Sequence, residues 1–179
     1  MEQQQELAVV ALAASASSPG NYSLVLEAIH TRQSLVLTIG PYEAQSIAVH
    51  MEQMDAGRPL SHELYLATVA ALGAQVRAVQ IYGLEGDLYL TRLCLRSAEQ
   101  ADHCIEARAS DAIAIALRAG VPVFVQETVL AAVAQRQQYL PAPPTRAALE
   151  TMLARLLAEE DYTGAEYVRR QLAQMPRGD

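Results

Sequence analysis

The stretch that most restricts the fold of this chain is RASDAIAIALRAGVPVFV, residues 108–125. Its centre, AIAIALRA, is apolar on almost every side of a helix, so this helix must be buried over most of its surface. Gly120 can end the helix in a left-handed conformation, and Pro122 prevents its continuation. The short apolar run VPVFV is typical of a buried strand. We therefore expect a helix that is enclosed by other elements and leads directly into a sheet.

The rest of the first 138 residues alternates between strand-like and helix-like patterns. Alternating apolar and β-branched residues predict strands at 6–12, 22–29, 34–40, 74–84, 88–96 and 102–108. Helical spacing of apolar residues predicts helices that begin at Pro41 and Ser61, and a closing helix at 127–137. The pattern as a whole predicts an α+β domain.

Several polar residues at the predicted helix ends have structural explanations. Ser61 and Ser110 are predicted N-caps, because a serine hydroxyl can accept a hydrogen bond from a free N–H of the first turn. A first-turn carboxylate contributes about 0.3–1 kcal/mol against the helix dipole. Glu43, Glu63 and Asp111 all lie in predicted first turns, so each of them has a structural role available.

The predicted core is aliphatic, because hydrophobic residues make up 51% of the chain while aromatic residues make up only 5%. Met51 and Met54 are expected to extend the apolar face of the helix that begins at Pro41. Cys94 and Cys104 are ten residues apart and form no CxxC pattern. We expect both to be free, buried thiols.

The charge of the chain restricts its partners. The net charge is −7 and all 13 basic residues are Arg, which excludes a Lys nucleophile. An acidic domain has no general electrostatic footprint for nucleic acid, although a local basic groove is compatible with it. The apolar runs are too short for a membrane-spanning helix. Glu2 and Glu6 lead an N-terminal segment without basic residues, unlike a secretory signal, so we expect a cytoplasmic protein with no membrane partner.

The C-terminal part of the chain has a different character. The prolines of YLPAPPTR, residues 139–146, predict a stiff, extended linker. Residues 147–175 show two amphipathic halves that break near residues 161–164, which predicts a small αα-hairpin. A hairpin of this size cannot bury its own leucine stripe, so the stripe requires a partner surface.

Three separated motifs carry a resemblance to a known family. IGPYEAQSIA (39–48), RPLSHEL (58–64) and EARASDAIAIALRAGVPVFV (106–125) resemble the bifunctional nuclease domain family in their order and spacing. This resemblance implies that residues 1–138 form the nuclease-like domain and that this domain has a mixed sheet flanked by helices. It also implies self-association, with a dimer favoured, and activity on both RNA and DNA. The segment 147–175 resembles the UVR motif, a helical hairpin of excision-repair and some Clp-protease adaptor proteins.

The chain departs from the family's pattern at four positions. Where the family has Asp-Ala-Arg-Pro-Ser-Asp, this chain has Glu106 and Ala109 in place of the first Asp and the Pro. Where the family has Thr-His-Asp, this chain has Ser61 and Glu63 around its histidine. The replacements keep the acidic and hydroxyl types. The longer acids change any metal geometry, and the loss of Pro loosens the entry into the helix.

The polar residues of these motifs are chemically sufficient for phosphodiester hydrolysis if their side chains converge. Hydrolysis requires an activated water, stabilisation of charge at phosphorus and a proton for the leaving oxygen. The expected catalytic residues are His62, Glu63, Asp111 and Glu43. The three carboxylates are also the expected ligands of Mg²⁺ or Mn²⁺, and no nucleotide or organic cofactor is expected. The expected substrate-binding residues are Arg108, Arg118 and Ser110.

A second hypothesis of another class stays open. In it, each polar residue only completes its own helix, and the protein is a non-catalytic oligomeric scaffold or adaptor. Its C-terminal hairpin would then dock on a protein partner through the leucine stripe. The acidic charge favours this scaffold, whereas the family resemblance favours a nuclease that takes RNA and DNA as substrates.

Overall fold

The structure is a computed structural model that describes residues 3–15, 18–54 and 57–139, and the single positions 150, 151, 153, 154 and 169. The chain divides into two units, Met1–Gln137 and Gln138–Asp179. The predicted linker 139–146 and hairpin 147–175 fall almost wholly outside the described residues and stay predictions. No helix among the described residues is long and apolar enough to cross a membrane.

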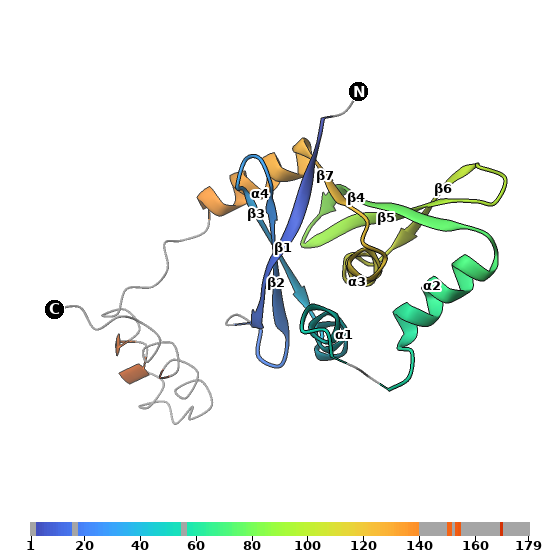
Figure 1. The fold of residues 1–179 in the computed structure, drawn as a ribbon. Coiled ribbons are helices and arrows are strands. Elements are labelled where there is room, and N and C mark those ends of the chain that lie inside the picture. Colours follow the sequence, from blue (N-terminus) through green and yellow to red (C-terminus); the bar gives the residue numbers. More distant parts are fainter. Residues whose placement is uncertain are drawn as a thin grey trace. The chain divides into compact units, whose positions relative to one another are not determined.

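The described part of the first unit is built on a mixed sheet of seven strands (Figure 1). The strands are β1 (Gln4–Ala14), β2 (Tyr22–Ala28), β3 (Ser34–Ile39), β4 (Gln75–Glu85), β5 (Leu88–Arg96), β6 (Asp102–Ala107) and β7 (Val123–Gln126). Their order across the sheet is β3-β2-β1-β7-β4-β5-β6. The pair β4 and β7 is parallel and the other neighbours are antiparallel. The predicted α+β class with a mixed sheet is confirmed.

Two helical connections place the functional motifs beside one another. The helices are α1 (Pro41–Met51), α2 (Ser61–Ala71), α3 (Ala109–Ala119) and α4 (Glu127–Tyr139). Helices α1 and α2 link β3 to β4, whereas α3 carries the chain from the edge strand β6 to β7 in the middle of the sheet. Helix α3 packs against α1, α2, β4 and β5, and Figure 1 shows it between α1 and α2.

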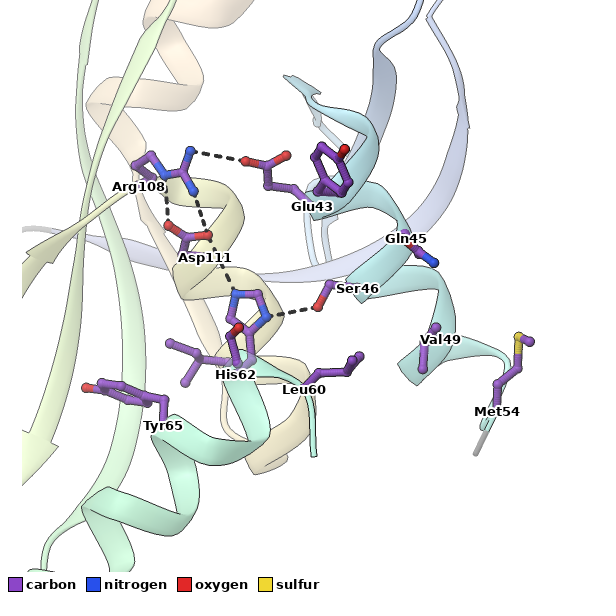
Figure 2. A pocket seen from close by; sticks show the side chains of 13 residues that line it. Glu43, Gln45, Ser46, Val49, Met54, Leu60, His62, Tyr65, Arg108 and Asp111 are labelled. Carbon is purple, nitrogen blue, oxygen red and sulfur yellow. Dashed lines mark hydrogen bonds and ion pairs between the residues drawn. The ribbon is translucent and has the colours of Figure 1, made fainter. Parts of the chain in front are cut away.

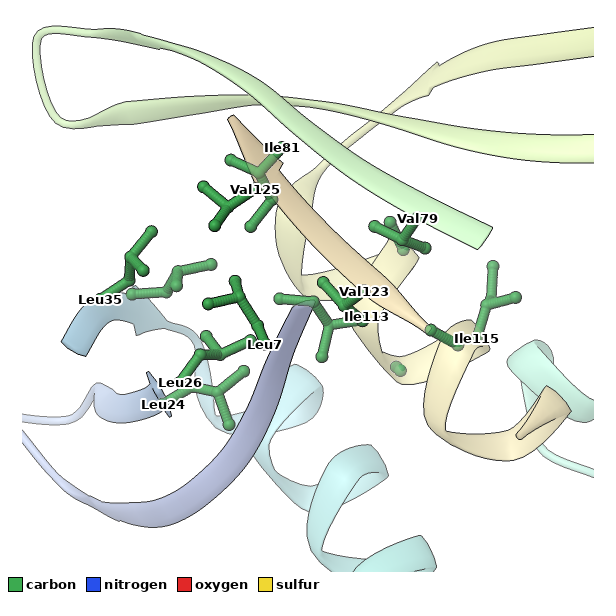
Figure 3. Close-up of a cluster of buried hydrophobic side chains, with 14 of the residues drawn as sticks. Leu7, Leu24, Leu26, Leu35, Val79, Ile81, Ile113, Ile115, Val123 and Val125 are labelled. Carbon is green, nitrogen blue, oxygen red and sulfur yellow. The ribbon is translucent and has the colours of Figure 1, made fainter. Parts of the chain in front are cut away.

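The core is aliphatic and centres on α3, as its composition predicts. Residues Ala112–Ala116 of α3 are all buried, and Gly120 ends the helix with φ of 64°. Figure 3 shows Ile113 among Leu24, Leu26, Val125 and other side chains of the buried sheet face. Full burial of each such side chain is worth about 1.5–3 kcal/mol, so this cluster holds α3 on the sheet.

The prediction for the two methionines of the α1 region is wrong. Met51 is 40% exposed and Met54 is 62% exposed. Helix α1 ends at Met51, so the helical spacing that would carry the apolar face to Met54 no longer applies. Ala44 and Ile47, one and two turns into the helix, are buried as predicted.

The helix starts differ from the predicted caps. Pro41 is the first residue of α1, as expected. Ser61 is already the first residue of α2, so Leu60 is the N-cap and Ser61 is not. Ser110 likewise lies inside α3, whose N-cap residue is Arg108. At α2 the free N–H of Leu60 is satisfied by Glu63, whose Oε2 accepts it at 2.8 Å.

The prediction of free cysteines is also wrong. Cys94 of β5 and Cys104 of β6 face each other across the antiparallel pair, with their Cα atoms 4.2 Å apart. They form a disulfide. Their spacing in sequence carries no sign of this, because the contact depends on the register of the two strands.

Replacing both cysteines with Ala should lower the free energy of unfolding by about 3 kcal/mol, because the bond closes a loop of roughly ten residues and restricts the unfolded chain. Urea unfolding of the oxidised protein measures the difference. A reductant should bring the natural chain close to the variant and leave the variant unchanged. A natural chain that is insensitive to the reductant would contradict the disulfide.

Glu63→Ala should lower the free energy of unfolding by at least about 1 kcal/mol, because it leaves the Leu60 N–H without its acceptor and also removes the carboxylate beside the buried Arg118. Glu63→Gln keeps an oxygen acceptor at the same position and is the matched control, so it should lose less. Thermal unfolding of the two variants compares them. Equal losses would show that the cap contributes nothing and that only the charge matters.

Candidate functional site

A pocket of about 870 Å³ opens where α1, α2 and α3 meet (Figure 2). Its polar lining includes Glu43 and Ser46 from α1, His62 from α2, and Arg108 and Asp111 from the start of α3. The remaining wall is largely apolar or aromatic. All three motifs, which are far apart in the sequence, therefore contribute to one concave site.

Arg108 lies at the entrance of α3 with its side chain 68% exposed. Its Nε and Nη2 donate to the two carboxylate oxygens of Asp111 at 2.8 and 3.1 Å. Its Nη1 lies 3.1 Å from Oε1 of Glu43. Hydrogen bonding to Asp111 raises the pKa of Arg108 above its ordinary value, so the guanidinium stays charged between two carboxylates.

Glu43 reaches Arg108 because its carboxylate bends back over the N-cap of α1. A Cβ on Gly40 would lie 2.6 Å from Oε2 of Glu43. The absence of a side chain at Gly40 therefore leaves the room that this carboxylate occupies.

His62 is the second residue of α2 and is held from both sides (Figure 2). Its Nδ1 lies 2.9 Å from Oγ of Ser46, and its Nε2 lies 3.6 Å from Oδ1 of Asp111. Only 16% of the side chain is exposed. The ring therefore has a fixed orientation, with one nitrogen toward α1 and the other toward the carboxylate of α3.

Three of the predicted site residues, Arg118, Glu63 and Ser110, lie outside the pocket lining, and the first two lie close to each other. Arg118 is 3% exposed, and its Nε lies 3.6 Å from Oε1 of Glu63. Its Nη2 donates to the carbonyl oxygen of Ser46 at 2.7 Å. The guanidinium of Arg118 is buried against α1 and does not line the pocket, so nothing in this arrangement supports the expected phosphate-binding role, which stays a prediction.

Of the remaining motif residues, Ser46 lines the pocket, whereas Ser110 and Glu106 do not. Glu106 accepts a hydrogen bond from the hydroxyl of Tyr82 at 2.8 Å and does not line the pocket either. Ser46 lines the pocket although sequence reasoning missed it, and its position one helical turn after Glu43 is the signal that places both on one helix face.

Two tyrosines complete the wall. Tyr42 is 82% exposed, whereas Tyr65 is partly buried against the core. Burial raises the pKa of Tyr65 above its ordinary value of 10, so its phenol is neutral at physiological pH. Both rings line the pocket and provide apolar contact area with a polar tip.

The expected metal ligands are not arranged as a metal site. Among the residues that the structure describes, no three His, Cys, Asp or Glu side chains are grouped so that they could hold an ion. Glu43 and Asp111 share Arg108, and Glu63 is bonded to the Leu60 N–H. Each of these carboxylates is the third residue of its helix. In this arrangement the three carboxylates do not form a ligand set for Mg²⁺ or Mn²⁺. A metal requirement stays a prediction.

Comparison with known proteins agrees with the motif resemblance. Two relatives from two strains of Mycobacterium tuberculosis, each named only as an uncharacterized protein, are 38% identical to this chain over 109 residues. The match covers 60% of this chain and 63% of each relative, so the chain spans less than two thirds of the relatives' length.

A family model described as the bifunctional nuclease domain matches residues 24–138. The matched range includes every residue that lines the pocket, from Tyr42 to Ile115. The site described above therefore lies within the part of the chain that defines the family. This chain belongs to the bifunctional nuclease domain family.

Proposed function

We propose that this protein is a nuclease that hydrolyses phosphodiester bonds in RNA and DNA, with the α1–α2–α3 pocket as its active site. The observation that supports this proposal is that a charged, exposed Arg108 and the His62–Asp111 pair lie in one pocket. Membership of the bifunctional nuclease domain family supports the same chemistry.

Arg108 is the group that would bind the scissile phosphate. A guanidinium fork matches two phosphate oxygens as well as it matches a carboxylate. Because Arg108 is the most exposed member of its ion-pair cluster, it can turn from Asp111 toward a phosphate without disturbing the core. This exchange would place the phosphate beside both His62 and Asp111.

Proton transfer and charge stabilisation are the tasks of the His62–Asp111 pair. When Arg108 turns to the phosphate, the carboxylate oxygens of Asp111 become free to accept a hydrogen bond from the attacking water. His62 lies 3.6 Å from the same carboxylate, so both groups reach the space in which the phosphate would lie. Hydrolysis needs a proton acceptor for the attacking water and a donor that stabilises charge at the phosphate, and Asp111 and His62 would supply these.

The substrate class that fits best is single-stranded nucleic acid. The chain has a net charge of −7, which provides little attraction for the backbone of a long duplex. Exposed aromatic rings can stack on unpaired bases of any sequence, and Tyr42 and Tyr65 line the pocket. An end or an unpaired segment can enter such a pocket, whereas a duplex cannot.

Self-association and a protein partner of the C-terminal hairpin are further parts of the proposal. In the described region, Leu64 on α2 and Leu72, the C-cap residue of this helix, are both exposed. Such exposure favours contact with a second copy of the chain, because exposed apolar side chains gain stability when they are covered.

Purified protein should cleave labelled single-stranded RNA and DNA, and His62→Gln and Asp111→Asn should each lower kcat by a factor of about 10²–10⁴, because the first removes the imidazole donor beside the phosphate and the second removes the proton acceptor. Thr31→Ala, which removes an exposed hydroxyl in the β2–β3 turn, is the control and should keep full activity. Equal trace activity in all four proteins would indicate contamination and would overturn the proposal.

The same assay tests the metal prediction by comparing chelator, Mg²⁺ and Mn²⁺. A rate that survives chelation would fit the ion pairs described above. A strict requirement for either ion would show that Arg108 leaves Glu43 and Asp111 in the working enzyme.

Arg108→Gln should raise KM by about 10–100-fold, because a charge-assisted hydrogen bond to phosphate contributes about 1.5–3 kcal/mol. Circular dichroism and the unfolding temperature establish that the variant is folded. Increasing salt should raise the KM of the natural protein more than that of the variant. An unchanged KM would assign phosphate binding to another group.

A further inference from the structure

Arg118 does not line the pocket, but it bonds the residue that holds the His62 ring. We propose that Arg118 and Ser46 are positioning residues that keep the neutral His62 ring with its proton on Nε2, directed toward Asp111. The inference rests on the proposed function only in its consequence for catalysis, because the position of a proton on the ring can be measured without substrate.

The guanidinium of Arg118 is a buried cation. A buried cation requires partners for its charge and its donors. Nη1 of Arg118 donates to the carbonyl oxygen of Ala114 at 3.1 Å, and Nη2 donates to the carbonyl oxygen and Oγ of Ser46 at 2.7 and 3.1 Å. Nε has no hydrogen-bond partner among the described residues, but the Glu63 carboxylate lies 3.6 Å away. The guanidinium thus joins α3 to both α1 and α2.

The hydroxyl of Ser46 contacts both Arg118 and His62. A guanidinium can donate but never accept a hydrogen bond, so Oγ of Ser46 must accept from Arg118. One hydrogen and one lone pair remain on Oγ, and Nδ1 of His62 lies 2.9 Å away. When the serine hydrogen is directed to that nitrogen, Nδ1 is the acceptor and the proton of the neutral ring is on Nε2.

The opposite side of the ring selects the same tautomer. Nε2 faces Oδ1 of Asp111 at 3.6 Å. A bare Nε2 would direct its lone pair at an anionic oxygen, whereas an Nε2–H is attracted to it. The alternative tautomer would also leave the hydrogen of the buried Ser46 hydroxyl without this acceptor. Two independent contacts, on α1 and on α3, therefore favour the Nε2–H form.

This arrangement assigns different tasks to the two groups of the His62–Asp111 pair. A neutral His62 with hydrogen on Nε2 presents a donor to the pocket, so it can hydrogen-bond a phosphate oxygen but cannot take a proton at that nitrogen. Asp111 is then the group that takes the proton from water and, as a carboxylic acid, passes it to the leaving oxygen, while the Nε2–H of His62 stabilises charge on the phosphate. Arg118 contributes to the reaction through Ser46 and His62 and not through contact with substrate.

The test is ¹⁵N NMR of the histidine ring in the full chain, with the His62 signals assigned by their loss in His62→Gln. The natural protein should show a protonated Nε2 and a bare Nδ1 at a pH where the ring is neutral. Ser46→Ala removes only the hydroxyl and should give a mixture of the two tautomers. Arg118→Lys cannot maintain both bonds to Ser46 and should shift the ratio in the same direction, whereas Thr31→Ala should not.

Kinetics provide the second readout. Ser46→Ala should lower kcat by about tenfold with KM within twofold, because a displaced catalytic group reduces turnover more than binding. The proposal is overturned if the natural protein carries the Nδ1–H tautomer, if Ser46→Ala leaves the tautomer unchanged, or if Ser46→Ala changes KM alone. If neither RNA nor DNA is cleaved while the tautomer shifts as expected, the nuclease proposal fails and the positioning role stands.

Discussion

The burial of α3 is the constraint on which the site depends. Because Ala112–Ala116 are enclosed, the two ends of the helix have fixed positions against α1, α2 and the sheet. The N-terminal end brings Arg108 and Asp111 to the pocket, and the C-terminal end places Arg118 between the helices. One apolar segment therefore positions both the exposed cation at the pocket and the buried cation that bonds Ser46.

Much of the fold is predictable because it depends on local patterns. The alternation in β2 and β3, Pro41 at the start of α1 and Gly120 at the end of α3 each specify an element without distant contacts. The failures involve information that is not local. The Cys94–Cys104 bond depends on strand register, and Met54 is exposed because α1 ends three residues before it.

The sequence predicts which residues gather at the site better than it predicts what each of them does there. Glu43, His62, Arg108 and Asp111 meet as the motifs imply, because the order of β3, α1, α2, β6 and α3 brings their helix starts together. The pattern cannot tell which way a side chain points. Arg118 and Glu63 are directed to each other, and the partner of His62 is a serine 16 residues away on another helix.

In the proposed nuclease, the arrangement of charges would let an acidic domain act on an anionic polymer. In the structure Arg108 is shared by Glu43 and Asp111, so the pocket presents little unpaired positive charge. In the proposed nuclease, a phosphate that enters the pocket would replace Asp111 as the partner of the Arg108 guanidinium, and the same exchange would leave Asp111 free beside His62. Binding and preparation of the proton acceptor would therefore be one event, and a ligand that cannot engage Arg108 would leave the carboxylate occupied.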